Sequence, residues 1–178
     1  MAEFHILGQI LSVHNFRDTH SLFCRYSIQA GKNLFDCETQ CICVCQSITN
    51  KFSILVYWSH PIDIHYVTKG IQGWPKLIFQ VSCLDSLSRS WVVGYGSCVV
   101  PAAPGHHSVR VTCWAPAPTT LTDKLRQTFL GGSHNVANID VISFGSDRFK
   151  LTTQSKGEIE LSLDIILRNF SQFGVEYK

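Results

Sequence analysis

Two histidines and an aspartate lie close together in the chain, and these residue types can bind metal ions or transfer protons. They are His60, Asp63 and His65. The residues around them alternate between apolar and polar types, as in a β-strand, where positions an odd number apart point to opposite faces. Positions 60 and 65 differ by an odd number, so the two imidazoles should not converge on one ion. We therefore favour separate surface or edge histidines over a metal site.

Cysteines form a second group with metal-binding potential. The chain has eight of them, and four lie close together at Cys37, Cys41, Cys43 and Cys45. Their spacing differs from the paired Cys-x2-Cys pattern of structural zinc sites. We therefore favour a cysteine-rich strand, with zinc binding as the alternative. Outside this group, Cys24, Cys83 and Cys113 fall in phase with apolar strand residues, which predicts buried thiols.

Carboxylates could bind calcium if several converged from neighbouring loops. The loop candidates are Asp63, Asp85, Asp147 and Asp164, and they occur singly among only 13 acidic residues. We expect solvated turn carboxylates. No Gly-x-Ser-x-Gly, His-Glu-x-x-His or phosphate-binding glycine loop occurs, so the sequence predicts neither an enzyme nor a cofactor or metal site.

Length and composition indicate one globular domain over residues 1–178, since 45% of the 178 residues are hydrophobic and 16% are charged. The net charge of +2 and the lack of basic clusters give no sign of a nucleic-acid partner. Met1-Ala2-Glu3 does not begin a signal peptide, and no apolar run is long enough to span a membrane. We expect a cytosolic protein with reduced thiols.

Short alternating segments with frequent turns predict an all-β fold. The expected strands are 4–13, 22–29, 41–45, 53–56, 62–67, 76–81, 90–100, 109–114 and 159–167. One short inserted helix is expected at 120–130, capped by Thr120, with Leu121, Leu125 and Phe129 on one apolar stripe. We predict an antiparallel β-sandwich of eight to ten strands with this helix packed on it.

The loop between the strands at 62–67 and 76–81 contains two glycines and a tryptophan followed by a proline. Its residues Lys69, Ile71, Gln72 and Trp74 are our candidate protein-contact loop, with a core or rim position for Trp74 as the alternative. The runs Trp-Ser-His-Pro-Ile-Asp (58–63), Lys-Gly-Ile-Gln-Gly-Trp-Pro (69–75) and Phe-Gln-Val (79–81) resemble the B9-domain family. Gly-Tyr-Gly (94–96) and the closing segment 167–175 are also similar. The resemblance covers about residues 2–175, with 37–55 atypical.

The resemblance implies a C2-like sandwich that acts as a non-catalytic scaffold. Such a protein would belong to the tectonic-like (Meckel syndrome/B9) complex at the ciliary transition zone and basal body, in the cytoplasm and cytoskeleton. That complex is needed for ciliogenesis and forms a diffusion barrier for transmembrane proteins. The implied partners are other B9-domain proteins and tectonic-type transmembrane subunits, with γ-tubulin and other basal-body components as more distant candidates.

An alternative of another class is a calcium-independent lipid-binding module. It would use Lys69, Lys76 and the loop of Trp74 at a membrane surface. Two lysines contribute only about 1 kcal/mol each, which is too little for stable attachment by one domain, so any membrane contact should be peripheral.

Overall fold

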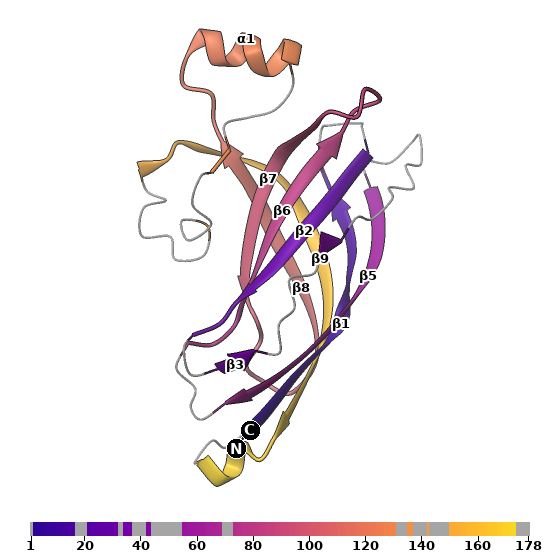
Figure 1. Ribbon diagram of the computed structural model, residues 1–178, viewed down its shortest axis with the longest axis vertical. Helices are drawn as coiled ribbons and strands as arrows, with labels where there is room; N and C mark the ends of the chain where they lie inside the picture. Colours follow the sequence, from indigo (N-terminus) through magenta and orange to yellow (C-terminus); the bar gives the residue numbers. More distant parts are fainter. Residues whose placement is uncertain are drawn as a thin grey trace.

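The structure is a computed structural model, and it describes residues 2–16, 21–31, 34–36, 42–43, 55–68, 73–130, 135–136, 142 and 150–173. Within these residues nine strands form one sheet, and every neighbouring pair is antiparallel. The strands are β1 Ala2–His14, β2 Ser21–Gln29, β3 Leu34–Asp36, β4 Ile42–Cys43, β5 Leu55–Thr68, β6 Lys76–Leu84, β7 Ser90–Val99, β8 Gly105–Pro116 and β9 Thr153–Arg168. One α-helix, α1 Leu121–Leu130, and a short 3-10 helix, η2 Phe170–Phe173, complete the described elements (Figure 1).

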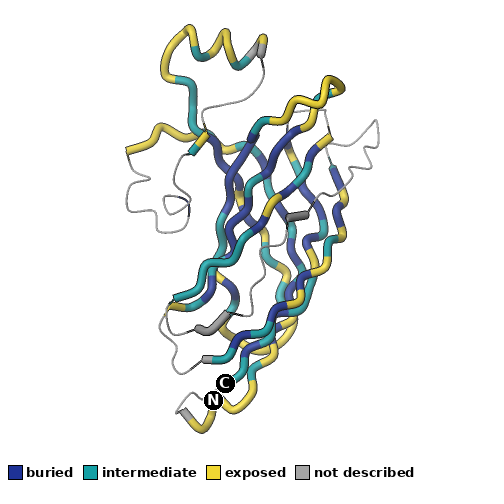
Figure 2. Tube along the Cα trace, in the orientation of Figure 1, coloured by how far each residue is buried: buried dark blue, intermediate teal, exposed yellow. Residues whose placement is uncertain are grey.

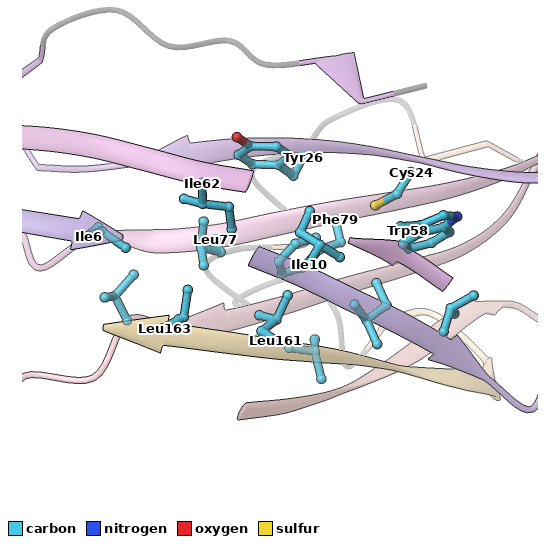
Figure 3. Packing of buried hydrophobic residues seen from close by; sticks show 14 of the residues in the cluster. Ile6, Ile10, Cys24, Tyr26, Trp58, Ile62, Leu77, Phe79, Leu161 and Leu163 are labelled. Carbon is cyan, nitrogen blue, oxygen red and sulfur yellow. The ribbon is translucent and has the colours of Figure 1, made fainter. Parts of the chain in front are cut away.

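The strand order is β3-β5-β1-β9-β8-β7-β6-β2-β4. Most neighbours pair over long registers, but β7 and β8 are joined only at Tyr95 and Trp114. This weak link separates two groups of strands, and side chains of β2 and β6 meet those of β1 and β9 across the core (Figure 3). The prediction of an antiparallel β fold is confirmed. The predicted sandwich of two separate sheets is not confirmed, because hydrogen bonding runs through all nine described strands.

The core forms from the apolar positions of the alternating patterns. On β9, Ile159, Leu161 and Leu163 are fully buried, while the residues between them are only partly buried. The same alternation appears on β5, where Ile62 and Ile64 point inward. Figure 2 shows this buried stripe along the centre of the strands. The period of two therefore set the inner face of each strand.

A smaller apolar cluster lies apart from this core and is called the outer cluster. Its buried members are Ile78, Val92, Tyr95, Trp114 and Ile142. Two hydrogen bonds fasten it: the backbone N–H of Val136 donates to Tyr95 Oη at 3.0 Å, and Ser97 Oγ donates to the carbonyl of Ile142 at 3.1 Å. Residues 136 and 142 thus contact β7, and Ile78 of β6 packs in the same cluster. At Ile78, therefore, β6 is buried on the face opposite the core as well.

Helix α1 begins where the sequence predicts. Thr120 Oγ1 accepts the N–H of Asp123 at 3.1 Å, and the Thr120 N–H donates to Asp123 Oδ2 at 3.4 Å, which is a reciprocal cap. The predicted packing of the helix on the sheet is wrong. Its apolar stripe is open to solvent, with exposed fractions of 78% at Leu121, 59% at Leu125 and 80% at Phe129. The helix stands beyond the end of β8, whose last residue is Pro116 (Figure 1).

The other predicted elements are largely recovered. β1, β2, β6, β8 and β9 contain the predicted strands and extend beyond most of them. The β6–β7 pairing has a register shift next to Gly94. Of the atypical segment 37–55, only β4 and Leu55 are described, so the expected strand at 41–45 lies mostly outside the described residues. The second half of the expected strand at 53–56 is the start of β5, which also contains the expected strand at 62–67. Within the described part of the chain, no helix has the length and hydrophobicity to cross a membrane.

Candidate functional site

Trp74 is the described member of the candidate protein-contact loop, because Lys69, Ile71 and Gln72 lie outside the described residues. Its ring is half-buried, with its centroid 4.8 Å from that of Phe4. Its indole N–H donates to the carbonyl of Val100 at 2.7 Å. Trp74 therefore anchors the end of the loop to the core. This position agrees with the alternative interpretation of Trp74 as a core or rim residue. Whether the loop binds a protein remains a prediction.

His60 and His65 point to opposite faces of β5, as their spacing predicts. The ring of His60 faces the interior, with its centroid 6.0 Å from that of the buried Tyr26. His65 and Asp63 alternate with the buried Ile62 and Ile64 and lie on the outer face. These three candidate ligands are therefore not brought together.

Three of the cysteines are buried as predicted. Cys24, Cys83 and Cys113 are fully buried and carry free thiols. Burial raises the pKa of the Cys113 thiol to about 12, with the negative charge of Glu158 as a smaller cause. Burial likewise raises the pKa of Cys98 to about 12. Both thiols stay protonated at neutral pH and are poor nucleophiles.

The cysteine-rich segment 37–45 lies mostly outside the described residues. Cys37, Cys41 and Cys45 lie outside the described residues, and Cys43 is described only as part of the backbone of β4. The choice between a strand of buried thiols and a zinc site in this segment stays a prediction.

The described carboxylates proposed for calcium are separated and engaged. Asp85 lies in the β6–β7 turn, where it accepts from Arg89 Nη2 at 2.8 Å and from the N–H of Ser86 at 2.7 Å. These bonds, led by Arg89, hold the pKa of Asp85 below its ordinary value. Asp164 contacts His106 Nδ1 at 2.8 Å.

Asp63 also lies apart from these two carboxylates. Both Asp63 and Asp164 pair with Leu7, from opposite sides of β1, so two strand spacings of about 5 Å separate them. Asp147 lies outside the described residues.

A serine, a histidine and a glutamate meet on β1 and β9, and the sequence motifs gave no sign of them. Ser12 Oγ lies 2.9 Å from His14 Nε2, and Glu160 Oε2 lies 3.4 Å from the same nitrogen. In a catalytic triad the carboxylate orients the opposite ring nitrogen, so that Nε2 is left to take the serine proton. Ser12 is also only 1% exposed. This group is therefore a polar contact that joins β1 to β9.

A second unforeseen group lies on the outer face of β1 and β5. It consists of Glu3, His5 and His65, whose potential ligand atoms all lie within 4.8 Å of one another. Glu3 and His5 share one face of β1, and His65 is the cross-strand partner of His5. The sequence shows the two-residue spacing of Glu3 and His5, but only the β1–β5 register brings His65 to them.

The structure thus defines an antiparallel β protein whose apolar core is closed and whose polar side chains gather in small groups on the outside. Comparison with known proteins then gives the family. The family model described as "Ciliary basal body-associated, B9 protein" matches residues 4–166. The chain is 42% identical to B9 domain-containing protein 2 of Danio rerio and 38% identical to that of Homo sapiens, each over 99% of both chains.

A second branch of the family matches more distantly. The chain is 24% identical to B9 domain-containing protein 1 of Mus musculus, over 96% of this chain and 84% of that protein. The chain belongs to the B9 family, which its description associates with the ciliary basal body.

Proposed function

We propose that this protein is a non-catalytic scaffold subunit of a complex of B9-domain proteins at the base of the cilium. The observation that carries the proposal is the match to B9 domain-containing proteins over nearly the whole chain. The complex is the tectonic-like (Meckel syndrome/B9) complex of the transition zone. There the protein helps to build the cilium and to maintain the diffusion barrier against transmembrane proteins.

The chemistry of the described residues supports a binding role. The thiols of the partly buried Cys98 and the buried Cys113 are held protonated, and the Ser12 group lacks the geometry of a triad. By contrast, α1 presents three large apolar side chains to solvent. Exposed apolar surface of this kind is typical of proteins that associate with other proteins.

The proposed partners are the other B9-domain proteins and the tectonic-type transmembrane subunits. Two surfaces are candidates for the contact: the loop of Lys69, Ile71, Gln72 and Trp74, and the apolar stripe of α1. We favour a sister B9-domain protein as the occupant of the stripe, because the stripe projects beyond the sheet and a rigid sister domain could cover it without disturbing the core.

Direct lipid binding is less well supported. Trp74, which would enter the membrane surface, is held by its bond to Val100 and its contact with Phe4. Lys76 is only half-exposed within β6. The purified protein should therefore not co-sediment with liposomes of anionic lipid. Co-sedimentation would favour the lipid-binding alternative.

A tagged copy in ciliated cells tests the proposal. We expect it at the ciliary base, with other B9-domain proteins and tectonic-type subunits recovered from crosslinked extracts. A copy carrying serine at Leu121, Leu125 and Phe129 tests the stripe, and a Lys69→Ala/Gln72→Ala copy tests the loop. A diffuse distribution of the unaltered copy, with none of these partners recovered, would contradict the proposal.

A further inference from the structure

The outer face of β1 and β5 carries an arrangement that the scaffold role does not use. His5 and His65 are directly opposite each other in the β1–β5 register. Their rings are stacked, with centroids 4.2 Å apart and planes inclined by 6°. Glu3 lies two residues before His5, on the same face of β1. One strand therefore supplies a carboxylate and an imidazole, and its neighbour supplies a second imidazole.

His65 contains an unusual nitrogen. Its Nε2 atom is inaccessible to solvent and has no hydrogen-bond partner among the described residues. A buried polar atom without a partner costs about 1–3 kcal/mol, so buried polar atoms in folded proteins generally have a hydrogen-bond partner, and an exception calls for an explanation such as a bound ion. Nε2 of a neutral imidazole is also a common metal-binding atom. The residue that carries this nitrogen belongs to the group of three whose potential ligand atoms lie within 4.8 Å of one another.

We propose that Glu3, His5 and His65 bind a zinc ion. Two imidazole nitrogens and one carboxylate oxygen are ligands that zinc accepts, whereas calcium and magnesium prefer oxygen alone. Ligands bound at about 2.1 Å in a tetrahedral site lie roughly 3.4 Å apart, so the three side chains must close inward. The two imidazoles must also tilt out of their parallel stack, because each nitrogen binds a metal through a lone pair in the plane of its ring. All three are half-buried, which leaves them room to do so. Three protein ligands leave the fourth position for water or for a donor from a partner protein.

Arg168 is the group that opposes the ion. It pairs with Glu3 across β1 and β9, and its Nη1 lies 3.4 Å from Glu3 Oε2. Its positive charge competes for the carboxylate and repels a cation. The arginine is largely exposed, with 71% of its side chain accessible, so it can turn away into solvent. Removal of its charge should therefore strengthen zinc binding.

The test uses the full chain without a histidine tag, stripped of metal by a chelator and with accessible thiols alkylated. Zinc is titrated by calorimetry, and cobalt is titrated by visible absorption. We expect one ion per chain, a cobalt spectrum without thiolate charge-transfer absorption, and a rise in Tm with zinc. His5→Gln and His65→Gln should each weaken zinc binding by at least about tenfold, the lower range seen when even an outer-shell partner is removed.

Two further variants sharpen the result. His106→Gln removes an exposed histidine that pairs with Asp164 on another part of the sheet, and it should leave zinc affinity unchanged. Arg168→Gln should increase the affinity. Glu3→Gln, a substitution on the surface, should weaken binding even if a histidine variant proves unstable; circular dichroism and Tm without metal check folding.

Two results would overturn the proposal. One is equal zinc affinity in the unaltered protein and in a folded Glu3→Gln or His5→Gln variant. The other is zinc binding that is present before the accessible thiols are alkylated and absent afterwards, which would assign the ion to cysteines. Neither result bears on whether the protein joins a complex of B9-domain proteins, so this inference and the proposed function can fail independently.

Discussion

Gly8 lies in the middle of β1, where the strand passes very close to β9. Its φ is +156°, and a Cβ placed there would overlap the backbone carbonyl oxygen of Ser162. Backbone atoms of a paired strand cannot move aside as a flexible side chain can. Gly8 is therefore required both by its own conformation and by the neighbouring strand.

Gly8→Ala should lower the free energy of unfolding by at least about 2 kcal/mol, from backbone strain and overpacking together. Gly105→Ala is the matched control, since Gly105 has a φ of +119° but no atom within 4 Å of the added Cβ. Denaturant unfolding of both variants separates the two effects. A loss at Gly8 no larger than that at Gly105 would show that β9 does not crowd this position.

The thiols of Cys98 and Cys113 should make the free energy of unfolding depend on pH in the alkaline range. Cys98 and Cys113 have a pKa of about 12 in the folded protein, against an ordinary value of 9.0. The folded state therefore holds these protons more tightly than the unfolded state. Their contribution to stability is fully present below about pH 9 and is lost as the pH rises towards 12.

Urea unfolding under reducing conditions at pH 8 and pH 10 measures this effect. We expect the free energy of unfolding to be lower at pH 10 than at pH 8. The decrease should be smaller in a Cys98→Ala/Cys113→Ala variant, which retains the other groups that titrate in this range. An equal fall in both proteins would contradict the raised pKa values.

Residue patterns predicted which side chains point inward, but not which of them meet. The inward positions of Cys24, Cys83 and Cys113 follow from the period of two along their strands. The opposite faces of His60 and His65 follow from the same rule. The meeting of His5 with His65 depends on the register between β1 and β5, which are far apart in the chain, so no local pattern could indicate it.

At the scale of elements, helix α1 shows where local rules end. Its start was predicted because the Thr120 cap is a short-range interaction. The packing of α1 was not predicted correctly. An amphipathic stripe indicates that a helix has an apolar face, but it does not indicate what covers that face. The sandwich prediction has a similar limit. Alternation predicts half-buried strands, but it does not predict the pairing of Tyr95 with Trp114 that joins the two groups of strands into one sheet.

Serine at Leu121, Leu125 and Phe129 should therefore change the stability of the isolated protein little, by less than about 0.5 kcal/mol per site, which is usual for surface positions. Leu161→Ala is the control in the core, where Leu161 is fully buried, and it should cost about 2–5 kcal/mol. Thermal and denaturant unfolding compare the two. A large loss in the helix variant would mean that the stripe is covered within the chain itself.

At the scale of the whole molecule, the described strands form one sheet, and its apolar side chains lie mainly in the core, in the outer cluster and on α1. The core and the outer cluster are buried and stabilise the fold, whereas the apolar side chains of α1 are exposed and available for association. The prediction of one domain over residues 1–178 remains a prediction.

The most direct test of the scaffold role is reconstitution with a purified B9 domain-containing protein 1 from the same organism. Size-exclusion chromatography with light scattering gives the mass of the mixture, and the serine variant of the α1 stripe provides the comparison. We predict a stable complex with the unaltered chain and a weaker one with the variant. Two proteins that elute separately as monomers, at concentrations well above those in the cell, would contradict the account.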